Sequence, residues 1–250
     1  MTGSRWYRAA VLAVAVLPAV AVAPGQAFAA AGNAKAYALI SQSQGKGLVA
    51  RWNPCAGPID YRVNPAGAPA NSLPEVKAAV ARIGAASGLV FRYAGTTSAV
   101  PRAAKGWNGK YPAGTEIVLA WVSPGRQSTM LPASSPKTTA GMGGASWVTA
   151  YTATGGPGLM MLQGQVVLNQ SLAAKMPRGF DAKPGGTTGQ LIMHELGHAI
   201  GLAHPAIADP HEVMYPTMTT KKAVWGPGDL TGLKKVGRSA GCLYARNPQA

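Results

Sequence analysis

The chain has 250 residues and carries 23 Lys and Arg against 8 Asp and Glu, a net charge of +15. Such a charge favours anionic surroundings such as acidic proteins, anionic cell-wall polymers or nucleic acid, but the basic residues are scattered and no nucleic-acid-binding motif accompanies them. Beyond the N-terminal segment no stretch is long and apolar enough to span a membrane, and the remaining residues fit one domain with a sizeable core.

The N-terminus has the pattern of an export signal. Arg5 and Arg8 precede an Ala/Val/Leu run over residues 9–23, and Ala27-Phe28-Ala29 supplies the small residues that a signal peptidase reads. The run is shorter than the about 20 apolar residues of a spanning helix, which disfavours a retained membrane anchor. We therefore expect residues 1–29 to be a signal peptide and the protein to be secreted, with cell-wall association left open. Removing the two arginines leaves 21 basic residues against 8 acids, a net charge of +13.

The mature chain is expected to begin loosely and to be cross-linked once. Residues 30–48 are small, polar and glycine-containing, which predicts a flexible N-terminal tether before a single domain over residues 49–250. The only two cysteines, Cys55 and Cys242, lie near the two ends of that domain. Because an exported chain with an even cysteine count usually pairs them, we expect a disulfide, with two buried thiols as the alternative.

The first half of the domain predicts strands around one helix. Ile59–Val63 alternates apolar and polar residues, as in a half-buried strand. Residues 72–75 have the spacing of a capping box with proline in the first turn, and they predict a helix that Gly88 ends. Leu89–Tyr93 alternates again, while Ile117–Val122 is continuously apolar, as in a central strand that is covered on both faces.

The second half is less regular. Residues 124–158 are rich in Gly, Ser, Thr and Pro, and only Ala145–Tyr151 looks extended. Val166–Asn169 predicts a further strand, and a glycine-rich loop leads from it to a helix with capping-box spacing at residues 187–190. Asp229 can cap a last helix. That helix carries three apolar residues, Leu230, Leu233 and Val236.

Residues 194–204 read His-Glu-Leu-Gly-His-Ala-Ile-Gly-Leu-Ala-His and hold three of the four histidines. On a helix, His194 and His198 project from one face, with Glu195 beside them. Gly201 lacks a Cβ atom and can take a positive φ that ends the helix, so that His204 approaches the same ion from another direction. Three neutral imidazoles with an open fourth position predict a catalytic zinc site. An apolar stripe opposite His194 and His198 disfavours the alternative, a helix whose histidines only cap a core or face solvent.

The chemistry expected of this site is hydrolysis. Zinc polarises a carbonyl and lowers the pKa of its water toward about 7, and Glu195 is the candidate general base. Two other classes of function stay open. A non-catalytic, zinc-stabilised secreted binding protein would need a fourth protein ligand that closes the site. A zinc hydrolase that acts on cell-wall peptides would share the site chemistry and suit the basic surface.

The histidine spacing, followed by Val213-Met214-Tyr215-Pro216, resembles the metzincin clan of zinc endopeptidases and is most similar to its matrixin family. The resemblance implies an α+β fold with a twisted, mixed, five-stranded sheet and three main helices. It implies that Met214 lies in a tight turn beneath the zinc without ligating it. It also implies a protein or peptide substrate that pairs with an edge strand near Gly144 and Ala145, and a side-chain pocket shaped by residues 215–225, with Tyr215 as a candidate wall.

Two expectations concern departures from that family. One histidine, His211, and eight acids remain outside the ligand set, so we predict one zinc ion, leave calcium undecided, and expect His211 to be a solvent-exposed loop residue. Residues 51–58, which include Cys55, superficially resemble a matrixin pro-segment whose thiolate fills the open zinc position. We expect no such latency, because the three residues between Cys55 and the first predicted strand span at most about 11 Å.

Overall fold

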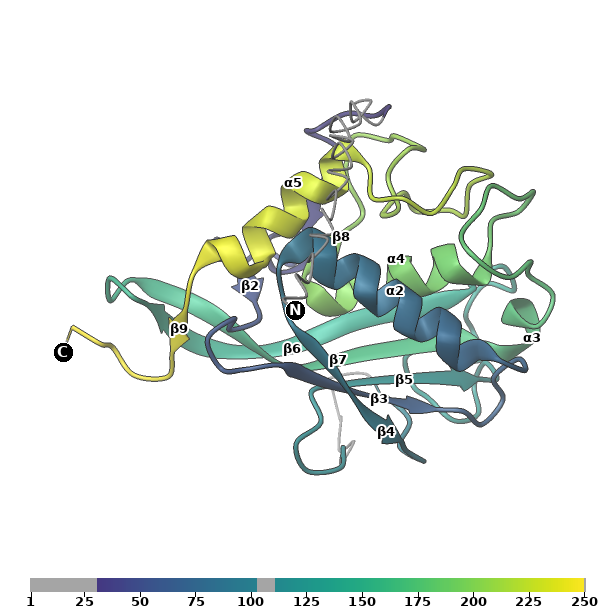
Figure 1. Cartoon of the computed structure of the whole chain (residues 1–250), viewed down its shortest axis with the longest axis horizontal. Helices are drawn as coiled ribbons and strands as arrows, with labels where there is room; N and C mark the ends of the chain where they lie inside the picture. Colours follow the sequence, from purple (N-terminus) through teal and green to yellow (C-terminus); the bar gives the residue numbers. More distant parts are fainter. Residues whose placement is uncertain (1–30, 103–110, 250) are drawn as a thin grey trace, which may run out of the picture.

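The computed structural model describes residues 31–102 and 111–249, so the expected signal peptide lies outside the described residues (Figure 1). The fold is α+β: three long helices lie on one side of a mixed sheet. Within the described residues the α-helices are α1 (Ile40–Ser43), α2 (Ser72–Ser87), α3 (Gln170–Ala173), α4 (Thr188–Ile200) and α5 (Pro227–Val236). A 3₁₀ turn, η1 (Arg238–Ala240), follows α5. No helix in the described part of the chain is long and apolar enough to cross a bilayer.

The main sheet has seven strands rather than the expected five, in the order β4-β3-β5-β7-β6-β9, with β2 paired to β7. The five longest strands account for the expected number, and two two-residue strands were not visible as patterns. Only the β6–β7 and β6–β9 pairs are antiparallel. The strands are β2 (Ala50–Arg51), β3 (Ile59–Asn64), β4 (Phe91–Thr96), β5 (Ile117–Val122), β6 (Gly141–Thr152), β7 (Pro157–Asn169) and β9 (Leu243–Tyr244).

A long hairpin of β6 and β7 contains the two predicted segments, Ala145–Tyr151 and Val166–Asn169, and extends well beyond them. The two strands pair from Gly141–Leu168 to Tyr151–Pro157, so backbone hydrogen bonds hold a segment whose glycines hide any alternation. The outer edge of β6 pairs with β9 only at Tyr151 and Thr152. The rest of β6 is therefore a sheet edge, and the expected edge strand near Gly144 lies within it.

The core lies between the sheet and the helices. Val76, Val80 and Ile83 of α2 are buried against it, and α2 ends at Gly88 in the left-handed conformation, as predicted. Helix α4 is buried on nearly all sides, not only along its predicted apolar stripe of Ile192, Met193, Leu196, Ala199 and Ile200. A helix so enclosed can place polar side chains only where they have partners or a cavity.

Two predicted helix starts are corrected. Ser72 lies inside α2 and its hydroxyl donates to Pro69 O, while the Glu75 carboxylate accepts from Gly179 N and Thr188 Oγ1, so no capping box forms there. Asp229 is the third residue of α5, behind the N-cap Gly226, and it accepts the Gly226 N–H. Thr187 does cap α4, because its hydroxyl accepts from Gln190 N.

The expected flexible tether is wrong for residues 31–48. Strand β1 (Ala38–Leu39) pairs antiparallel with β8 (Leu202–Ala203), directly before His204. Ala36, Leu39 and Ser41 are buried, and the Ser41 hydroxyl donates to Leu48 O and accepts from Ala50 N. A small, polar composition therefore does not prevent packing here, since the polar groups are satisfied internally.

The expected disulfide is present between Cys55 and Cys242, 187 residues apart in sequence. Beside it, the Asn53 side chain bonds both the N–H and the carbonyl of Leu243, and the buried Arg51 guanidinium donates to Gly241 O. These contacts fasten residues 241–243 near the C-terminus to residues 51–55, which run from the end of β2 toward β3. Because both cysteines of the chain are in this bond, neither supplies a thiolate to the histidine cluster.

Candidate metal centre

The three predicted histidine ligands meet at one point. His194 and His198 lie one turn apart on α4, and Gly201 (φ 119°) ends the helix so that β8 carries His204 back toward them. His204 Nε2 lies 3.0 Å from His194 Nε2 and 3.1 Å from His198 Nε2. Two nitrogens that bind one zinc at 2.0–2.1 Å in tetrahedral geometry are about 3.3 Å apart, so this spacing suits a shared ion.

Backbone carbonyls select the ring tautomers. His194 Nδ1 lies 2.7 Å from Val213 O, and His198 Nδ1 lies 2.9 Å from Leu202 O. A carbonyl can only accept, so both Nδ1 atoms carry the proton and both Nε2 atoms point their lone pairs at His204. A proton on His204 Nε2 could satisfy only one of these lone pairs. A cation at the centre satisfies all three nitrogens, and carbonyls on the opposite ring nitrogens are the usual outer partners of metal-binding histidines.

Burial keeps the helix histidines neutral. Burial lowers the pKa of His194 to about 4 and that of His198 to about 3, and it also lowers the pKa of His204. Neutral imidazole is the metal-binding form. Within the described residues, 31–102 and 111–249, this triad is the only group of three or more His, Cys, Asp or Glu side chains whose ligand atoms lie close enough together to hold a metal ion.

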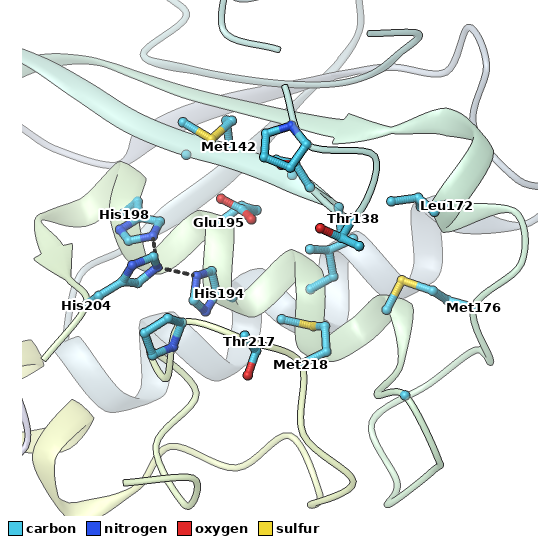
Figure 2. Close-up of a pocket in the computed structure, with 18 of the residues that line it drawn as sticks. Thr138, Met142, Leu172, Met176, His194, Glu195, His198, His204, Thr217 and Met218 are labelled. Carbon is cyan, nitrogen blue, oxygen red and sulfur yellow. Dashed lines mark hydrogen bonds between the residues drawn. The ribbon is translucent and has the colours of Figure 1, made fainter. Parts of the chain in front are cut away.

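Glu195 is a buried carboxyl group next to the histidines. Burial raises its pKa to about 8, and the backbone N–H of Gly143 on β6 partly offsets that effect. A divalent cation at the triad would favour the ionised form, as any nearby positive charge does. Figure 2 shows Glu195 between the histidines and the cavity beside them, where its oxygens can meet a bound molecule.

Met214 lies directly against the ligand helix. It is buried, and a Cβ atom on Gly197 of α4 would collide with its Sδ atom. Gly197 therefore lets the Met214 side chain sit close to the helix backbone, one residue before His198. This packing places Met214 against the helix that carries His194 and His198.

Two buried acids that the sequence analysis did not connect to the site hold the Met214 turn. Asp229 accepts the N–H groups of Val213 and Met214, and Glu212 accepts those of Gly228 and Asp229. Val213 in turn offers its carbonyl to His194. Burial and the nearby Glu212 raise the pKa of Asp229 to about 7. The sequence gives little indication of these roles for Glu212 and Asp229, because each is a single acidic residue in a loop or at the start of a helix.

A cavity of about 1020 Å³ opens beside the triad. Figure 2 shows the three histidines at one end and Leu172 and Met176 toward the other, with Met142 of β6 on one side and Thr217 and Met218 on the opposite side. Its walls come from β6 and the segment before it, from the loop around α3, and from the loop after Met214. These are regions in which the sequence showed little pattern.

The residues that line the cavity are close neighbours of the predicted substrate-binding residues. Gly141, Met142 and Gly143 line the cavity, whereas Gly144 and Ala145 do not. Pro216, Thr217 and Met218 line it on the other side, whereas Tyr215 does not. A Cβ atom on Gly143 would collide with Glu195 O, so this glycine permits the close approach of β6 to α4.

His211 lies apart from the centre. It is a partly exposed loop residue whose Nδ1 lies 2.9 Å from the Asp209 carboxylate, so it is paired rather than free in solvent.

In comparisons with known proteins, no protein-family model matched the chain and no significant match to a curated protein was found.

Proposed function

We propose that the protein is a secreted zinc-dependent endopeptidase. The observation that carries the proposal is that the ring nitrogens of His194, His198 and His204 converge on one point. Backbone carbonyls fix the first two rings in the tautomer whose Nε2 atom has a free lone pair. The buried carboxyl group of Glu195 and an open cavity lie beside them. The resemblance of residues 194–216 to the metzincin clan, and to its matrixin family in particular, supports the same reading.

The residues divide the work of hydrolysis. His194, His198 and His204 would hold the zinc ion, which would supply Lewis-acid chemistry to the peptide carbonyl and a water of lowered pKa, about 7. Glu195 takes a proton from the attacking water while the water oxygen bonds to the carbonyl carbon. Glu195 then gives a proton to the leaving nitrogen as the C–N bond breaks. The carbonyls of Val213 and Leu202 hold two of the rings in the required tautomer.

An extended peptide suits the surroundings of the triad. The outer edge of β6 is unpaired over most of its length in the described structure, and Gly141–Gly143 of the same strand line the cavity. A substrate backbone can add to such an edge by main-chain hydrogen bonds while one of its side chains enters the cavity. A closed, purely structural zinc site is less well supported, because the described residues offer three converging ligands and no fourth.

Metal removal tests the proposal. We expect the purified mature protein to contain one zinc per chain by elemental analysis and to cleave an unfolded protein substrate. Dialysis against a strong chelator should abolish cleavage, and one equivalent of zinc should restore it. Full cleavage by protein shown to be metal-free would overturn the proposal. Parallel digestion of a purified cell-wall preparation separates a general peptidase from an enzyme of wall peptides.

A further inference from the structure

Two exposed lysines line the cavity, and three more lie close to its lining residues in sequence. Lys137 and Lys175 line the cavity itself, and Lys183 lies in the loop that supplies Pro184 and Gly185 to its wall. Lys221 and Lys222 follow the third wall, after Met218. All five are exposed. Neither Lys137 nor Lys175 has an ion-pair partner among the described residues.

Negative charge is nearly absent there, and every acid of the chain can be accounted for. The eight acidic residues all lie in the described structure. Asp181, at 3.8 Å from Lys222, is the single exposed acid on these wall loops, and Glu195 is buried at the triad. The other six are engaged elsewhere by arginine, histidine or backbone N–H groups: Asp60, Glu75, Glu116, Asp209, Glu212 and Asp229.

The cavity interior is apolar by contrast. Leu172, Met176, Leu191 and Met218 line it, and the labelled members of this group face the cavity in Figure 2. Methionine side chains are flexible and polarisable, so they adapt to apolar groups of different shape. An acidic side chain buried among them would lose its hydration without a buried partner, whereas at the mouth it would face ammonium groups in solvent.

From this arrangement we infer an electrostatic selectivity: acidic residues that flank the segment entering the cavity favour its cleavage. The inference rests on the proposed peptidase function and adds its selectivity. Lys137 and Lys175 act as specificity-determining residues, and the remaining lysines of the rim raise the local concentration of acidic segments by electrostatic attraction.

A set of three peptides tests the inference. All share one cleavable core with a leucine as the apolar residue, and they differ only in flanking residues, which are Glu, Gln or Lys. We expect kcat/KM for the Glu peptide to exceed that for the Gln peptide about threefold to tenfold, since each exposed ion pair contributes modestly, and the Lys peptide to be poorest. The preference should shrink in 0.5 M salt, where the Debye length falls to a few ångströms.

Variants locate the effect. The double variant Lys137→Gln and Lys175→Gln should lower the ratio of kcat/KM for the Glu peptide to kcat/KM for the Gln peptide toward one. Lys234→Gln with Lys235→Gln, which removes the same charge from α5, a helix that does not line the cavity, should keep the ratio. If the wild type cleaves the Gln peptide but shows no preference, the inference is wrong and the proposed function stands. If it cleaves none of the peptides, the proposed function is wrong. The third outcome is that an anionic cell-wall polymer binds these lysines while kcat/KM for the Glu peptide does not exceed that for the Gln peptide. That outcome would assign the lysines to polymer binding and overturn the inference.

Discussion

The histidine side and the cavity side of the site are built from different kinds of contact. Two ligands come from one helix and the third from a turn six residues later, and carbonyls that cannot rotate away fix two of the rings. The cavity walls come from three distant segments whose lining residues include exposed lysines. The first arrangement tolerates little change, and the second can vary its side chains without losing its shape.

The cavity side nevertheless has its own anchors. Glu75 on α2 accepts from Gly179 N and Thr188 Oγ1 and pairs with Arg178 at 2.8 Å, which fastens the wall loop to the core. Ala223 N donates to Phe180 O, which joins that loop to the wall after Met214. The difference between the two sides predicts that substitutions at the triad remove chemistry, whereas substitutions on the lysine rim alter selectivity.

The largest effect should come from removing a ligand on the histidine side. His204→Ala leaves two imidazoles, so zinc affinity should fall by more than the about 10- to 100-fold typical of losing an outer partner, and cleavage should fall with it. Zinc content and kcat/KM measure the effect. His211→Ala is the matched control, because His211 pairs with Asp209 away from the triad. Equal zinc content in His204→Ala and the wild type would remove His204 from the ligand set.

A methyl group added at Gly143, where β6 approaches α4, should lower the free energy of unfolding. Gly143→Ala would push β6 away from Glu195 O, and overpacking of this kind costs about 1–3 kcal/mol in the free energy of unfolding. At Gly144, the nearest atom to an added Cβ is Gln165 Oε1 at 3.8 Å, so Gly144→Ala should change stability by less than about 0.5 kcal/mol. Denaturant unfolding of the two variants decides it; equal stabilities would contradict the close contact of β6 with α4.

A smaller effect on zinc affinity is expected from Asp229, which contacts the histidines only through the Met214 turn. Asp229→Asn places an amide among the N–H groups of Val213, Met214 and Gly226, and should lower zinc affinity by up to about tenfold through Val213 and His194. Competition with a chromophoric chelator measures the affinity, and Asp209→Asn is the control. At saturating zinc, kcat should stay close to that of the wild type. Unchanged affinity would mean that the turn holds its position without Asp229.

A pH dependence is expected of the metal-free protein, in which no cation offsets the burial of Glu195. The Glu195 pKa is about 8 in the folded protein, above its ordinary value of 4.5, because burial favours the neutral acid. The stability contributed by that proton is fully present below about pH 4.5 and is lost as the pH rises toward 8. Relative to Glu195→Gln, the metal-free wild type should therefore lose stability between pH 5 and pH 8. A difference between the two proteins that stays constant over this range would contradict the burial argument.

The sequence predicted the histidine side well because its information is local. The spacing of residues 194–204 combines the helix period with the conformational freedom of Gly201, and both the convergence of the histidines and the Cys55–Cys242 bond are confirmed. The β6–β7 hairpin was predicted only in part, over Ala145–Tyr151 and Val166–Asn169. Its full length was not visible, because several of its glycines pack against α4 instead of alternating with polar residues. The flexible tether was wrong because β8, which is distant in sequence, pairs with it. Asp229 caps α5 from the third helical position and not from the N-cap position, and it also binds the Met214 turn, which is distant in sequence.

The central claim is that a metal held by the three histidines and a base at Glu195 together hydrolyse peptide bonds. Glu195→Gln separates the two, because the amide keeps the shape of the side chain but lacks a basic oxygen. Zinc stoichiometry and kcat should be measured on the same samples of wild type and variant with one peptide substrate. We predict one zinc per chain in both proteins and a kcat that falls about 10²- to 10⁴-fold in the variant. A zinc-loaded variant with near-wild-type kcat would contradict the account.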